Sequence, residues 1–137
     1  MSVMSADNTL ERLREVRLPL LHLHKTLLDY ERETYERQHD RIENAYEVLR
    51  LVMHDPWFAW LHSISELVVS IDEMLDADEP PAAADIEAVI KQARQLIVPS
   101  ETGTEFQQKY FAALQNSPDA VLAHADTVRV LGPLNAK

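Results

Sequence analysis

Histidine and carboxylate side chains are the groups of this chain that could bind a metal ion or transfer protons. The chain of 137 residues has six His and 23 Asp or Glu residues. His24 and His124 lie on the apolar stripes of the first and last predicted helices, so both imidazoles are expected to face the core. If they face one another, they can hold haem or a metal ion, or bind a polar ligand. The competing interpretation is that each imidazole hydrogen-bonds a neighbouring group at the core margin.

A polar run on the first predicted helix is the expected location of a binding site. Glu31, Tyr35 and His39 continue the helix face of His24, provided that this helix is unbroken. Together with His124 they form the predicted cofactor-binding or ligand-binding set. The sequence requires no cofactor, and haem or a metal ion is the alternative.

Two metal-binding patterns were compared with the histidines. Ferritin-like di-iron proteins carry Glu-x-x-His on two helices, and here only Glu36 and His39 match. A single match among so many acidic residues is close to chance. Residues 24–29 and 62–66 resemble the H-x-x-x-x-D and H-x-x-x-E elements of hemerythrin-like proteins, but their order differs and H-x-x-x-H is missing. The His and Glu of residues 62–66 lie away from the apolar stripe and are predicted to be a solvated pair.

Several kinds of chemistry are excluded by composition. The chain has no Cys, which removes disulfides, thiolate zinc sites, iron–sulfur clusters and Cys nucleophiles. Gly103 and Gly132 are its two glycines, too few for a phosphate-binding loop or a dinucleotide-binding turn. No serine lies in a nucleophile-elbow pattern. No catalytic residues are therefore predicted.

Charge and hydropathy limit the partners and the location. The formal net charge is −10, and residues 51–137 carry 13 acidic against five basic side chains. Because nucleic acids and anionic lipids are bound mainly through Lys and Arg, neither is an expected partner. No apolar run reaches the roughly 18–20 residues of a membrane span, and the N-terminus does not have the pattern of a signal peptide. A cytoplasmic location is predicted.

The first half of the chain is predicted to contain two helical regions and a polar extension. The first helix begins near Asp7 and contains Pro19, which predicts a kink or a break. Residues 29–43 form a polar helical extension, with a possible break at 39–41, and a second apolar patch covers residues 45–53. Whether the first helix is continuous through residues 29–53 is left open.

The second half begins with the strongest helix signal in the chain. Asp55 can cap a helix and Pro56 fits its first position, so one core helix is predicted for residues 55–76. A linker at 77–82 separates it from an apolar stripe at 86–97. Thr104 and Gln107 form a capping box for a short helix, and a last helix runs from 118 to a flexible tail at 132–137. The chain is predicted to be all-α, a single domain of residues 1–137 forming an antiparallel four- to five-helix bundle.

Aromatic residues supply the candidates for a protein interface. Trp57, Phe58 and Trp60 cover more than one face of the predicted helix. They either fill the core or leave one ring exposed for a partner, since Trp and Tyr are enriched at binding hot spots. The predicted interface residues are Tyr35, Trp57 and Trp60.

Two segments carry a resemblance to known proteins. Residues 23–31 read LHKTLLDYE and residues 55–67 read DPWFAWLHSISEL. With these segments the chain resembles a family of small bacterial all-helical proteins. The resemblance implies a bacterial source and a helical bundle, and it implies no activity.

Two functions remain open at the level of sequence. The leading hypothesis is a non-enzymatic protein that acts through protein contacts, self-associating as a homodimer through residues 29–43 or the Trp57–Trp60 end. The alternative is a bundle that binds haem, a metal ion or a small ligand through inward-facing His, Glu and Tyr.

Overall fold

The chain is all-α, as predicted. The computed structural model describes residues 2–132, with the side chains described from residue 10 onward, and these residues contain helices and no strand. There are six α-helices, against the four or five expected, and one 3-10 helix. They are α1 (Ser2–Gln38), α2 (Ala45–His54), η1 (Pro56–Leu61), α3 (His62–Asp76), α4 (Ala83–Leu96), α5 (Glu105–Asn116) and α6 (Pro118–Leu131). Of the predicted tail, residues 133–137 lie outside the described residues.

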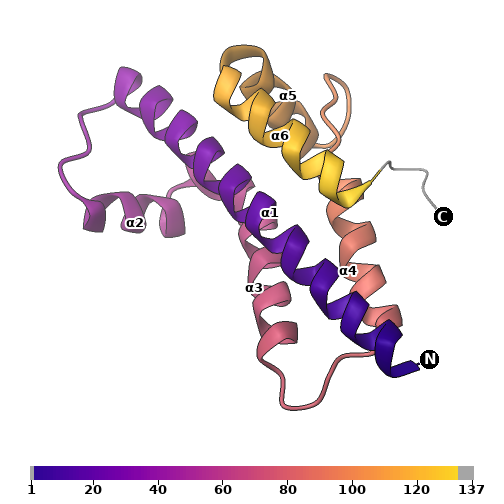
Figure 1. Ribbon diagram of the computed structural model, residues 1–137. Helices are drawn as coiled ribbons and strands as arrows, with labels where there is room; N and C mark the ends of the chain where they lie inside the picture. The colour runs from indigo at the N-terminus through magenta and orange to yellow at the C-terminus, as the bar shows by residue number, and fades with distance from the viewer. Residues whose placement is uncertain (1, 133–137) are drawn as a thin grey trace.

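The long helix α1 is the element on which the others assemble. It contacts η1, α3, α4 and α6 (Figure 1). Its buried stripe repeats at helical spacing and consists of Leu13, Val16, Leu20, Leu23 and Leu27. The helix continues through Pro19, where a kink or a break was expected. The neighbouring helix α6 runs antiparallel to α1. Thr127, near the C-terminal end of α6, donates to the carbonyl of Pro19, whereas Asn116, just before the start of α6, donates to the hydroxyl of Tyr30.

The polar extension is helical only in its first part. The helix α1 ends at Gln38, and residues 39–44 form the connection to α2. In this connection the backbone N–H of Ile42 donates to Glu36 Oε2 at 2.7 Å, and the Ile42 side chain is buried. Asn44 then caps α2 by accepting a hydrogen bond from the N–H of Glu47. In Figure 1, α2 lies to one side of the other helices, and it packs against η1.

The predicted core helix at 55–76 is two elements. The Asp55 side chain accepts from the N–H of Trp57 and starts η1, a 3-10 helix, before α3 begins at His62. In 3-10 winding, side chains three residues apart lie on the same side. Phe58 and Leu61 have this spacing, and both are fully buried. The 3-10 winding thus turns both of these side chains into the core.

The last two helices follow their predicted start signals. The segment 77–82 lies between α3 and α4. Thr104 and Gln107 form a reciprocal capping box at the start of α5, and Ser117 caps α6 with Pro118 at its first position. No helix within residues 2–132 combines the length and the apolar character needed to cross a bilayer.

Two arginines bind the C-terminal end of α6. The guanidinium of Arg12 on α1 donates to the carbonyl of Leu131 at 3.1 Å, and Nε of Arg94 on α4 donates to the same carbonyl at 2.7 Å. The last carbonyls of a helix have no partner within the helix and carry partial negative charge, so cations stabilise them. This arrangement joins the end of α6 to both α1 and α4.

Candidate functional site

Three of the predicted site residues, His24, Glu31 and Tyr35, lie along one face of α1, and His39 follows directly after its last residue. This follows because α1 is continuous from His24 to Gln38, so the expected common face is present. Along this face Glu31 contacts η1, and so do the rings of Tyr35 and His39. The partners come from a segment about 20 to 30 residues further along the chain.

Glu31 is bonded to one of the two tryptophans. The indole N–H of Trp60 donates to Glu31 Oε2 at 2.9 Å. Partial burial raises the pKa of Glu31, against the opposing effects of the Trp60 hydrogen bond and of the positive charge of Lys109. The carboxylate borders a cavity of about 250 Å³ that is also lined by Tyr30 and Trp57.

Tyr35 and His39 are part of an aromatic cluster. Their rings stack with centroids 4.0 Å apart and 8° between the planes, and the ring of Trp57 approaches both of them edge-on. The cluster is completed by Phe58, 5.6 Å from the Tyr35 ring. The Nε1 atom of Trp57 is buried and has no hydrogen-bond partner among the described residues.

Burial bears directly on the predicted interface residues. Trp60 is only 6% exposed, and its ring packs on Phe106. Trp60 therefore belongs to the core. This corrects the expectation that its side chain is an interface residue. Tyr35 and Trp57 are half-buried and contact one another.

His24 lies near another histidine, His62. Burial lowers the pKa of His24, and the electrostatic interaction with His62 lowers it further. The His62 side chain was expected to be solvated with Glu66, but its Nε2 lies 2.7 Å from the carbonyl oxygen of Val52. The helix-face argument missed this contact because Val52 lies on another helix, α2.

His124 has a different set of neighbours. Its Nδ1 lies 2.6 Å from the hydroxyl oxygen of Tyr110 on α5, and burial lowers its pKa. Of the two core-facing histidines, His124 therefore has a hydrogen-bond partner on a neighbouring helix. A chain of ring contacts from Trp60 through Phe106 and Tyr110 reaches His124.

The described residues do not assemble a metal-ligand set. Among residues 10–132, no group of three His, Cys, Asp or Glu side chains could hold a metal ion. The metal version of the ligand-binding hypothesis therefore gains no support from this geometry.

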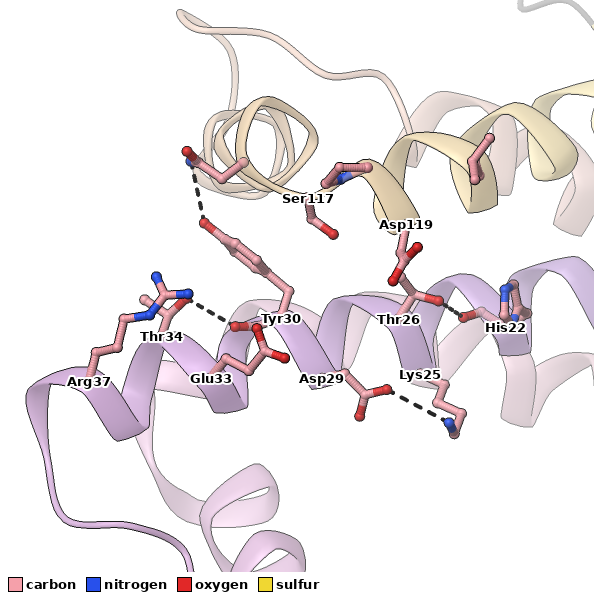
Figure 2. A pocket seen from close by; sticks show the side chains of 13 residues that line it. His22, Lys25, Thr26, Asp29, Tyr30, Glu33, Thr34, Arg37, Ser117 and Asp119 are labelled. Atoms are coloured by element: carbon pink, nitrogen blue, oxygen red, sulfur yellow. Dashed lines mark hydrogen bonds and ion pairs between the residues drawn. The ribbon is translucent and has the colours of Figure 1, made fainter.

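A polar groove of about 780 Å³ lies between α1 and the start of α6. Figure 2 shows Tyr30 and Thr26 on α1 opposite Ser117 and Asp119 on α6. Lys25 and Asp29 form an ion pair within α1, and Asn116 donates to the Tyr30 hydroxyl at 3.5 Å. Because charges of both signs line it and Lys25 and Asp29 are already paired, the groove has the character of a solvated surface.

The helix α2 carries an apolar stripe on its outer face. The side chains of Tyr46, Leu49 and Met53 are 74%, 56% and 56% exposed. They are spaced at i, i+3 and i+7, which places them on one side of the helix. Leu51 is buried on the other side. The sequence showed apolar residues throughout 45–53, and their helical spacing could not indicate which face is left uncovered.

Comparisons with known proteins do not assign the chain to a family. No protein-family model, curated protein or solved structure matches the chain.

Proposed function

We propose that this chain is a non-enzymatic helical protein that acts through protein–protein contacts and forms a homodimer through the outer face of α2. The observation that carries the proposal is the exposed stripe of Tyr46, Leu49 and Met53. Removing apolar surface from water is favourable, and contiguous exposed apolar patches mark interaction sites. The antiparallel packing of the long helices supplies a scaffold that holds this face outward.

The charges of α2 favour a second copy of the same chain as the partner. Glu43 and Glu47 lie at the start of this segment, whereas Arg50, which forms an ion pair with Glu47 at 2.8 Å, and His54 lie toward its end. In a two-fold dimer the same surface meets itself. An antiparallel pair of α2 helices would therefore set the acidic start of each helix beside the basic end of the other, and Tyr46 beside Met53 of the second copy.

The small size of the face predicts a weak and reversible dimer. A helix of ten residues offers less surface than a standard interface, which buries about 1,600 Å² in total. Self-association should therefore depend on concentration within the range that sedimentation velocity covers.

The test compares two substitutions at equally exposed apolar positions. Leu49→Lys places a charge in the centre of the stripe and should leave the protein monomeric at every concentration. Val69→Lys on α3, where the side chain is 54% exposed, is the matched control and should sediment like the unmodified protein. A monomer at all concentrations before substitution, or equal effects of the two substitutions, would refute the proposal.

A further inference from the structure

A further cavity lies between the end of α4 and the C-terminal half of α6. Its volume is about 260 Å³. The walls are mainly hydrocarbon, from Ile97, Val98, Pro99, Val128 and Leu131, and two further lining residues, Arg94 and His124, have polar side chains. Apolar walls with a few fixed polar groups are typical of small-molecule sites.

The Tyr110 contact determines which nitrogen of His124 carries the proton. Tyr110 is fully buried, and His124 Nδ1 is the hydrogen-bond partner of its hydroxyl among the described residues. Burial raises the pKa of Tyr110 and lowers that of His124, so a neutral phenol meets a neutral imidazole. Because no other acceptor lies within hydrogen-bond distance of this buried hydroxyl among the described residues, the phenol donates to Nδ1, and the imidazole carries its single proton on Nε2. An N–H donor is thereby left for a molecule in the cavity.

Arg94 is held in place beside the same cavity. Its Nε donates to the Leu131 carbonyl at 2.7 Å, and its Nη2 lies 4.0 Å from the position that a Cβ on Gly132 would take. The terminal nitrogens retain donors, because a guanidinium has five N–H groups in a fixed plane. This plane matches the geometry of a carboxylate.

We propose that this cavity binds a small monocarboxylic acid with an apolar tail. The guanidinium of Arg94 and Nε2–H of His124 bind the carboxylate, and the tail packs against Ile97, Pro99 and Val128. The cavity is slightly smaller than the roughly 300–1,000 Å³ of drug-sized sites, so the ligand has about eight non-hydrogen atoms, like hexanoate. The site is separate from the outer face of α2 and does not depend on the dimer.

The experiment is a nuclear magnetic resonance titration of the full chain with hexanoate and, separately, with 1-hexanol. Both probes have the same tail, so their difference isolates the carboxylate. Hexanoate should bind about tenfold more tightly than hexanol. It should shift the amide signals of residues 94–98 and 124–132 and the ring Nε2 signal of His124.

Three variants make the result decisive. Arg94→Gln should lower hexanoate affinity to that of hexanol and leave hexanol binding unchanged, which also shows that the cavity is still folded. Arg129→Gln, at an exposed arginine on α6, is the matched control and should keep the preference. Val128→Phe should fill the cavity and abolish binding of both probes. The absence of saturable shifts, equal affinities for the two probes, or an unchanged preference in Arg94→Gln would overturn the proposal.

Discussion

At the scale of single residues, Glu31 combines two opposing effects. Partial burial disfavours its charged form, whereas the Trp60 N–H and the positive charge of Lys109 favour it. The first effect is the larger, so its pKa is raised above the ordinary value of 4.5. A carboxyl group with a raised pKa is more stable in the folded protein when it is neutral.

This balance predicts opposite effects for two substitutions of Glu31. Gln keeps an acceptor for Trp60 without the buried charge, so Glu31→Gln should unfold at the same or a higher urea concentration at pH 7. Ala leaves the indole N–H unpaired, and Glu31→Ala should lower the free energy of unfolding by about 1–3 kcal/mol. Urea unfolding followed by tryptophan fluorescence measures both.

The contribution of Glu31 to the free energy of unfolding depends on pH with a definite sign. Because the folded pKa is higher than the unfolded one, the folded state binds the proton more tightly, and the unmodified protein loses stability as the pH rises from 4.5 through the folded pKa. The advantage of Glu31→Gln should therefore grow between pH 4.5 and pH 7. Glu33→Gln, at an exposed position of the same helix, should show no such trend. A Glu31→Gln variant less stable than the unmodified protein at pH 7 would contradict this account.

Helical periodicity predicted the common face of the candidate site but not its partners. The spacing of Glu31, Tyr35 and His39 places them on one side of any continuous helix. Which side chains cover that side depends on how a distant segment packs, and the 3-10 winding of η1 brings Trp57 and Trp60 there. Pairing of His124 with Tyr110 is likewise a tertiary contact between two helices.

At the scale of elements, local signals predicted helix ends better than helix continuity. Capping residues act within three positions in the sequence, so the starts at Asp55, Thr104 and Ser117 could be read directly. The continuity of the helix through Pro19 could not be predicted from local signals. Packing along α1 outweighs the backbone hydrogen bond that the proline removes.

The capping box of α5 provides a prediction at this scale. A Cβ on Gly103 would lie 1.9 Å from Gln107 Oε1, the atom that accepts from the N–H of Thr104. Gly103→Ala should therefore displace the Gln107 side chain and break that bond. Gln107→Ala removes the same bond, and each change should destabilise the protein by about 0.5–1.5 kcal/mol.

A double-mutant cycle tests whether both changes act through one bond. If they do, the Gly103→Ala/Gln107→Ala protein should be little less stable than either single variant, as thermal unfolding would show. Additive losses would mean that Gly103→Ala acts elsewhere, for example on the backbone of the loop before α5.

At the scale of the whole molecule, the helices differ in how firmly they are held. Contacts with α1 secure η1, α3, α4 and α6, whereas the packing partner of α2 is the short helix η1. One face of α2 is apolar and exposed. Segments with few buried contacts open locally at a free energy far below that of global unfolding.

Amide hydrogen exchange should therefore separate α2 from the rest of the chain. In dilute solution the amides of α2 should exchange through local opening, at rates well above those of the central turns of α1 and α3. In concentrated solution the proposed dimer covers α2, and mass action should then slow its exchange while leaving that of α3 unchanged. Leu49→Lys should remove the dependence on concentration without altering exchange in α3. If the amides of α2 exchange as slowly as those of α3 in dilute solution, the inference that α2 is loosely held is wrong. If the exchange rate of α2 does not depend on protein concentration, a second copy does not bind to this helix.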